Sequence, residues 1–256
     1  MSAPRLPAGV RIGCVPYLNA KPLIRGIERD CLLDHPARLA EELFAGRLDA
    51  ALVPVAEWFR HPEFAAVDGV GICCDGAVYS VVLAGMGALR QVDTLLLDEA
   101  SRTSALLARL LLRDTPPASW RGLPPASAAD WRPAPGQAAL LIGSQAISLR
   151  QRYPAIPVVD LGAAWKALTG LPFVFAVWLL HPGFRERSRL ADSLRAIAAD
   201  GMRWRTTLDP GSFEHHSLNR CIQFPLDTAE KHGLAEFRTQ ARLLDERVSP
   251  TEPAWL

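Results

Sequence analysis

Small, mostly polar residues stand at four points of the sequence where a strand is expected to give way to a helix. In chain order they are Asn19, the pair Pro54 and Val55, the run Ser101, Arg102, Thr103 and Ser104, and the pair Gly143 and Ser144. In open α/β sheets, ligands bind outside the carboxyl ends of the strands. Helix N-terminal amides, supplemented by Ser or Thr hydroxyls, bind carboxylates well. The pattern therefore predicts a site for an anionic small molecule.

A purely structural interpretation of these corners stays open. Ser101 is a favoured helix N-cap residue, so it could serve only to start its helix. Arg102 could pair with a ligand carboxylate or could belong only to the helix start. Gly143 would let the backbone approach a ligand closely, because glycine has no Cβ. Four such corners in one chain favour a binding site over four unrelated helix starts.

The sequence lacks the motifs of several common enzyme classes. It contains no G-x-x-x-x-G-K-[ST] loop, no G-x-S-x-G elbow, no H-E-x-x-H pair and no G-x-G-x-x-G that opens a helix after a strand. These absences argue against nucleotide hydrolysis, triad hydrolysis, zinc proteolysis and dinucleotide redox chemistry. The six histidines have no metal-ligand spacing, and the five cysteines include no C-x-x-C pair. We therefore expect reduced thiols that are buried or semi-buried, and no metal site.

Composition limits the possible partners. The 256 residues carry 28 basic and 27 acidic side chains, a net charge of +1, which lacks the basic excess of a nucleic-acid surface or a polybasic membrane anchor. The longest apolar run, residues 171–180, contains Pro172 and is shorter than the ~20 residues that span a bilayer. Residues 1–9 lack the apolar core of a secretory signal. We expect a cytoplasmic protein with no nucleic-acid or membrane partner.

Short apolar runs alternate with amphipathic stretches along most of the chain, which is typical of an α/β protein with a mainly parallel sheet. Strands are expected at residues 11–15, 49–53, 69–75, 77–84, 92–97, 138–142, 157–160 and 172–180. Helices are expected near Lys21, from Ser101, and at residues 36–44, 145–150, 163–168, 185–204 and 228–247. Asp227 and Glu230 have capping-box spacing at the start of the last helix. The length allows one large domain or two modest ones.

Eight blocks of sequence, in order, resemble the chorismate dehydratase family (MqnA) of menaquinone biosynthesis. The most specific are Y-L-N-x-x-P-L at residues 17–23, S-R-T-S at 101–104 and T-G-L-P-F-V-F-A-V-W at 169–178. The resemblance extends through residues 12–23, 48–57, 75–81, 97–104, 139–143, 160–165, 168–178 and 221–226. It therefore covers nearly the whole chain.

The resemblance implies a periplasmic-binding-protein-like fold of type II. Such a fold has two α/β lobes, joined by two hinge strands, with the ligand in the cleft between them. The expected strands at residues 77–84 and 172–180 are the candidate hinges. One lobe would then comprise residues 1–84 and 179–256, and the other residues 85–178, each of ordinary domain size.

The resemblance also implies an activity. The family removes water from chorismate to give 3-[(1-carboxyvinyl)oxy]benzoate, the first step of the futalosine route to menaquinone, and needs no cofactor. Chorismate carries two carboxylates, which suits a cleft with neutral donors on both walls. We expect Ser101, Thr103 and Ser104, with the backbone amides at that helix start, to hold one carboxylate, and Asn19 and Ser80 to hold polar groups from the other lobe. The predicted substrate-binding residues are Ser80, Ser101, Arg102, Thr103, Ser104, Gly143, Ser144 and Phe173.

Asn19 is the predicted catalytic residue. The reaction removes the proton on C3 and the hydroxyl on C4, and no corner presents an obvious protein base. We therefore expect the enolpyruvyl carboxylate of the substrate to accept the proton while Asn19 orients the reacting atoms. Phe173 and Phe175 either cover the substrate ring or pack only within the hinge.

Two departures from the family and two alternative functions remain. Family members often carry an acidic residue where this chain has Ser144, and a Ser-Asp-Gly-Pro run where it has residues 74–77, Cys-Asp-Gly-Ala. One alternative is a non-catalytic solute-binding protein of the same fold for a small carboxylate. The other is the related 1,4-dihydroxy-6-naphthoate synthase of the same pathway. No oligomeric state is predicted.

Overall fold

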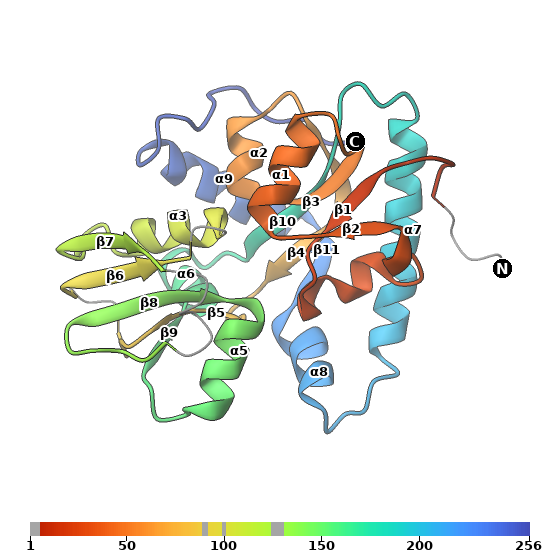
Figure 1. The fold of residues 1–256 in the computed structure, drawn as a ribbon. Coiled ribbons are helices and arrows are strands. Elements are labelled where there is room, and N and C mark those ends of the chain that lie inside the picture. Colours follow the sequence, from red (N-terminus) through yellow and green to blue (C-terminus); the bar gives the residue numbers. More distant parts are fainter. Residues whose placement is uncertain (1–5, 89–91, 99–100, 124–130) are drawn as a thin grey trace.

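Two β-sheets divide the protein into two α/β lobes, as the computed structural model shows (Figure 1). The structure describes residues 6–88, 92–98, 101–123 and 131–256. We call the part built on the first sheet lobe 1 and the part built on the second sheet lobe 2. This is the two-lobed arrangement that the sequence resemblance implies.

The sheet of lobe 1 has six strands in the order β11-β4-β10-β3-β1-β2. Their bounds are β1 Ile12–Cys14, β2 Cys31–Leu33, β3 Ala50–Pro54, β4 Ala65–Cys74, β10 Phe173–Leu180 and β11 Gln223–Leu226. Strand β1 pairs in parallel with β2 and β3, whereas β10 runs antiparallel between β3 and β4. Strand β11 pairs antiparallel with β4 at one edge.

The sheet of lobe 2 repeats this plan with five strands in the order β7-β6-β8-β5-β9. Their bounds are β5 Val81–Ala84, β6 Thr94–Leu97, β7 Ser119–Gly122, β8 Gln137–Ile142 and β9 Val158–Asp160. Strand β6 pairs in parallel with β7 and β8, and β5 runs antiparallel between β8 and β9. Each sheet is therefore mainly parallel in direction. In lobe 2, β5 runs opposite to the other four strands, and in lobe 1, β10 and β11 run opposite to the other four. Strands β5 and β10 are inserted into their sheets where the chain crosses between lobes.

The lobe boundaries differ from those predicted from the sequence, because β5 and β10 belong to the opposite sheets from those expected. The predicted boundaries, after residues 84 and 178, assign β5 to lobe 1 and most of β10 to lobe 2. Hydrogen-bonded pairing instead places all of β5 in the sheet of lobe 2 and all of β10 in the sheet of lobe 1. The chain therefore crosses in the short segments 75–80 and 170–172, because a buried strand that is paired on both sides belongs to its sheet.

Helices flank both sheets (Figure 1). The α-helices are α1 Pro36–Phe44, α2 Val55–Arg60, α3 Arg102–Leu111, α5 Gly143–Arg152, α6 Leu161–Thr169, α7 Arg187–Arg205, α8 Phe213–His216 and α9 Thr228–Arg242. The helix expected near Lys21 is the short 3-10 segment η1, Leu18–Ile24, with Pro22 inside it. The predicted capping box at Asp227 and Glu230 is confirmed at the start of α9.

The crossing segment 75–80 holds a strained backbone. Among the described residues, Tyr79 is the non-glycine residue with a positive φ, +65°, a conformation that bulky side chains rarely adopt. Asp160 accepts hydrogen bonds from the amides of Val78 and Tyr79, at 3.0 and 2.7 Å. Arg150 lies over the Tyr79 ring, 3.8 Å from its centroid, and donates to the Tyr79 carbonyl. Lobe 2 thus fixes this end of the crossing.

One hydrophobic core runs through both lobes. Strand β5 shows how it is divided: Val81 and Leu83 face the large core, whereas Val82 and Ala84 face a smaller cluster within lobe 2. The five cysteines are free thiols, as predicted, and four of them are buried. No helix in the described part of the chain is long and apolar enough to cross a membrane.

Candidate functional site

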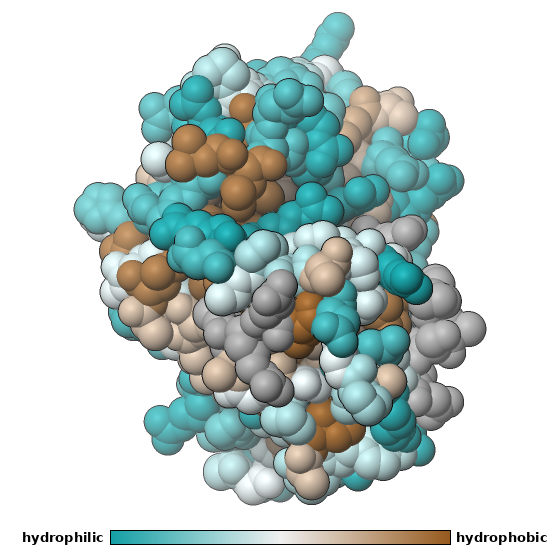
Figure 2. All heavy atoms as spheres, turned by 90° about the vertical axis from the view of Figure 1, so that its left-hand side faces the viewer, coloured by the Kyte–Doolittle hydropathy of each residue, from teal (hydrophilic) through white to brown (hydrophobic). Residues whose placement is uncertain are grey.

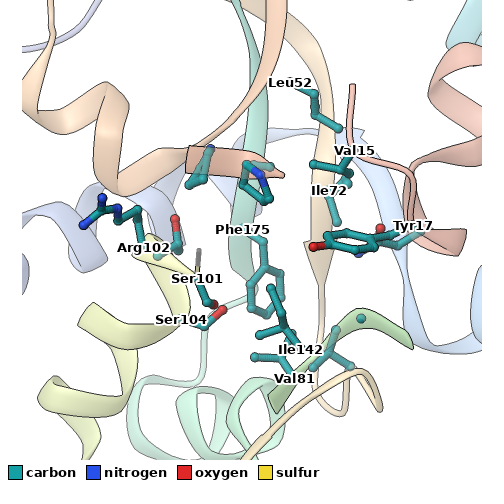
Figure 3. A pocket seen from close by; sticks show the side chains of 17 residues that line it. Val15, Tyr17, Leu52, Ile72, Val81, Ser101, Arg102, Ser104, Ile142 and Phe175 are labelled. Atoms are coloured by element: carbon teal, nitrogen blue, oxygen red, sulfur yellow. The ribbon is translucent and has the colours of Figure 1, made fainter. Parts of the chain in front are cut away.

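A cavity lies between the two lobes (Figure 3). It contains about 610 Å³ of space free of protein atoms, part of it open to solvent, which is in the range of small-molecule sites. Lobe 1 and the first crossing line it with Val15, Tyr17, Asn19, Pro36, Leu52, Pro54, Ile72, Val78, Phe175 and Ala176. Lobe 2 contributes Val81, Ser101, Arg102, Thr103, Ser104, Ile142 and Gly143. In Figure 3, Ser101 and Ser104 lie on one side of Phe175 and Tyr17 on the other.

The four polar corners of the sequence all reach this cavity. Asn19 follows β1, Pro54 ends β3, Ser101 follows β6 and Gly143 follows β8. Each comes at the carboxyl end of a strand, and the two sheets present those ends to the same space. The structure thus brings together residues that lie more than a hundred positions apart in the sequence.

The start of α3 presents hydroxyls and helix amides to the cavity. Ser101, Thr103 and Ser104 are 4%, 3% and 5% exposed. Ser101 occupies the N-cap position, but its side chain makes no capping hydrogen bond, so the structural interpretation of this residue does not hold here. Thr103 Oγ1 accepts a hydrogen bond from the Ala56 amide at 3.2 Å and so links α3 to α2 of lobe 1. Ser101 and Ser104 are the side chains best placed to bind an anion.

Two buried polar atoms at or beside the cavity lie without a hydrogen-bond partner in the described part of the chain. They are Asn19 Oδ1 and Ser80 Oγ. Both residues line a small hollow that shares Tyr17, Asn19 and Gly143 with the main cavity. A buried polar atom without a partner costs about 1–3 kcal/mol, and most such atoms in native proteins are paired. These two atoms therefore mark places where a ligand group is expected to bind.

The start of α5 closes the space between these groups. The Gly143 amide donates to the Ser80 carbonyl at 2.8 Å, and Gly143 has φ +54°. A Cβ at this position would stand 3.3 Å from the Tyr17 ring, so glycine allows this corner to approach Tyr17. No side chain caps α5, and its electropositive end faces the hollow that Ser144 also lines.

The aromatic residues of the site differ from those expected. Phe175 lines the cavity, whereas Phe173 is 1% exposed and packs against Trp165 and Phe237, at 5.4 and 4.8 Å between ring centroids. The structure therefore places Phe175 at the cavity and Phe173 in the core. Tyr17 was missed as a site residue, although the Y-L-N block contains it. Burial, and then the charge of Asp98, raise the pKa of the Tyr17 phenol, so it stays protonated at neutral pH.

The acidic residues at the ends of β3 and β9 and the basic residue at the start of α3 are engaged in contacts of their own. Asp49 bonds Arg11 at 2.6 Å; burial opposes its ionisation, but the bonds and charge of Arg11 outweigh burial and lower the pKa of Asp49. Asp160 caps α6 and holds the crossing segment. Arg102 is 45% exposed in its side chain and lies 3.6 Å from Glu57. The described residues lining the cavity include no Asp, Glu, His, Lys or Cys.

A metal site is not evident in the described part of the chain. None of its His, Cys, Asp and Glu residues form a group of three or more that could hold a metal ion. The polar groups that line the cavity are hydroxyls, the Asn19 amide, the Arg102 guanidinium and helix amides, which suit carboxylates better than a metal.

The fold is that of the periplasmic-binding-protein class. The chain superposes on the periplasmic aliphatic sulphonate binding protein SsuA of Escherichia coli with a TM-score of 0.56 and 14% identity, covering 95% of this chain and 94% of that one. Within this fold class, the chain belongs to the menaquinone biosynthesis family, whose model matches residues 10–242.

Two curated relatives carry a more specific name. A chorismate dehydratase of Thermus thermophilus is 29% identical over 260 residues, which cover 88% of this chain and 93% of the relative. A chorismate dehydratase of Campylobacter jejuni is 29% identical over 162 residues, which cover 62% of this chain and 58% of the relative.

Proposed function

We propose that this protein is a hydro-lyase that converts chorismate to 3-[(1-carboxyvinyl)oxy]benzoate, the first step of the futalosine route to menaquinone. The observation that carries the proposal is the unpartnered buried atom Asn19 Oδ1, in a residue that lines the same cavity as the hydroxyls of α3, together with the unpartnered Ser80 Oγ in the adjoining hollow. Membership of the menaquinone biosynthesis family and two relatives named chorismate dehydratase support it.

The two walls of the cavity suit the two carboxylates of the substrate. Ser101 and Ser104, with the amides at the start of α3, bind one carboxylate. Asn19, Ser80 and the start of α5 bind polar groups from the other side. Because the ligand contacts both lobes, its binding favours the arrangement in which they are close together. Phe175 and the Tyr17 ring cover its apolar face.

The elimination is redox-neutral and proceeds by loss of a proton and then a hydroxyl. The C3–H bond breaks, and its electron pair delocalises through the ring diene into the ring carboxylate. Donors on that carboxylate stabilise the developing charge, as in an oxyanion hole. The C4–O bond then breaks, the hydroxyl leaves as water with one proton, and the ring becomes aromatic.

The proton acceptor in this proposal belongs to the substrate. The described lining residues offer no side chain that titrates near neutral pH, whereas the enolpyruvyl carboxylate is carried close to C3 by the ether link. Asn19 orients the C3–H bond and the enolpyruvyl carboxylate of the substrate, and it neither donates nor accepts the transferred proton. Hydroxyls and amides supply the remaining contacts, and the proposed reaction requires no cofactor.

The test is incubation of the purified protein with chorismate, with the enolpyruvyl benzoate followed by liquid chromatography. The proposal predicts stoichiometric formation of this product, and much slower formation by the Ser101→Ala variant. The fold also suits a non-catalytic binding protein for a small carboxylate. Tight binding of chorismate without any product would overturn the proposed activity and favour that alternative.

A further inference from the structure

A second groove lies on the other side of the wall formed by Ser101 and Arg102. It is larger than the cavity, with about 970 Å³ of space free of protein atoms, part of it open solvent. Lobe 2 lines it with Leu97, Asp98, Ser101, Arg102, Ala105, Leu106, Arg109, Trp120, Arg121 and Gly122. Lobe 1 lines it with Arg60, Leu244, Asp245 and Arg247. We call it the arginine groove.

The elements that line the groove include β6 and β7 and the segment after α9, which lie on the same side of the molecule (Figure 1). Figure 2 looks onto that side, and a hydrophilic band crosses it between regions that carry hydrophobic residues. The groove concentrates positive charge, since five arginines and two aspartates line it in a chain whose net charge is only +1.

Three of the five arginines are paired with acidic residues. Arg60 and Arg247 both bond Asp245. Despite burial, the hydrogen bonds of these arginines hold the pKa of Asp245 far below its usual range. Arg102 lies near Glu57, which also bonds Arg60. These ion pairs involve three of the arginines and do not include Arg109 and Arg121.

Arg109 and Arg121 form no ion pair with any described residue. Both are exposed. The Arg109 guanidinium lies over the Trp120 ring, 5.3 Å from its centroid, which holds it in place by a cation–π contact while leaving its N–H edge free. A guanidinium binds a carboxylate or a phosphate through two parallel hydrogen bonds. Two such cations beside paired ones make a site for an anion with more than one charge.

We propose that the arginine groove is a second anion-binding site, which takes a small multivalent anion bearing carboxylate or phosphate groups. Arg109 and Arg121 bind the anion, and Trp120 supports Arg109. Because the groove shares Ser101 and Arg102 with the cavity, the anion is either the substrate on its way to the cavity or a separate ligand that acts on the same wall.

The test uses inorganic pyrophosphate as the probe and isothermal titration of the full chain at low ionic strength. The groove variant is Arg109→Gln with Arg121→Gln. The matched control is Arg29→Gln with Arg185→Gln, which removes two exposed arginines that lie outside the groove. We expect the groove variant to bind pyrophosphate about tenfold more weakly or worse, and the control to bind as the unaltered protein does. Absence of binding, or equal weakening in both variants, would overturn the proposal.

A second experiment distinguishes substrate that passes through the groove from a separate ligand. It rests on the proposed function, because it measures the turnover of chorismate. Pyrophosphate that raises the KM for chorismate without changing kcat, in the unaltered protein but not in the groove variant, indicates passage of the substrate through the groove. Pyrophosphate that changes kcat, again only in the unaltered protein, indicates a separate ligand. If chorismate is not turned over at all, the titration still tests the site by itself.

Discussion

Replacing Ser80 by Ala should stabilise the free protein and weaken its binding of ligand. Ser80 is 4% exposed, and its hydroxyl has no hydrogen-bond partner. An unsatisfied buried hydroxyl costs about 1–3 kcal/mol, and the void left by its removal offsets part of the gain. The backbone bonds of Ser80 to Val78 and Gly143 are untouched by the change. We therefore expect the free energy of unfolding to rise by about 1 kcal/mol.

Two measurements on the same preparations test whether the variant is more stable and also binds its ligand more weakly. Thermal unfolding followed by circular dichroism should show a midpoint about 2–4 °C higher. Loss of one ligand hydrogen bond of about 1 kcal/mol should weaken chorismate about fivefold, as KM or as a calorimetric Kd. The control is Thr169→Val, because the Thr169 hydroxyl donates to the Trp165 carbonyl and accepts from the Leu171 amide. That variant should unfold at a lower temperature, with unchanged KM. A Ser80→Ala protein that is less stable and binds chorismate normally would refute the reasoning.

Three further predictions follow from the site and its surroundings. Asn19→Ala should lower kcat about 100-fold or more in the product assay while the circular dichroism spectrum is unchanged; full turnover would remove Asn19 from the mechanism. Phe175→Leu should raise KM, whereas Phe173→Leu should lower the unfolding midpoint and leave KM unchanged, because only Phe175 lines the cavity. The pKa of Asp245 is depressed in the folded state, so its contribution to stability is present above its unfolded pKa of about 3.9 and is lost as the pH falls below that value. Urea unfolding at pH 7 and pH 3 should therefore show a smaller pH dependence in Asp245→Asn than in the unaltered protein.

The corners of the site could be predicted from sequence because they depend on local patterns. Ser101 stands between an apolar run and a periodic helix, and Gly143 follows another apolar run, so both could be placed at strand ends. That they meet in one cavity follows from the general rule for parallel sheets rather than from any contact visible in the sequence.

The lobe boundaries could not be predicted in the same way. Whether residues 81–84 belong to one sheet or the other depends on pairing with β8 and β9, which lie more than fifty residues away. The alternation of side chains between the two faces of a strand also could not predict that Phe175 lines the cavity while Phe173 packs in the core. The register of β10 against β4 shifts between Val174 and Ala176, so two residues of the same parity differ in what they contact.

The first crossing, residues 75–80, contains the left-handed backbone of Tyr79, and its contacts with the two lobes differ. Asp160 and Arg150 of lobe 2 hold Tyr79, and its ring also meets Phe213 of lobe 1 at 5.1 Å between centroids. If the lobes separate, the ring loses Phe213 but keeps its lobe 2 partners. Gly76 has φ +109° and open space where a side chain would lie, but its carbonyl packs against Gly162 of α6. Its neighbour Asp75 is ion-paired with Lys166 of the same helix. The first crossing is therefore bound to lobe 2 from Asp75 to Tyr79, and a separation of the lobes would have to bend the chain where it leaves β4.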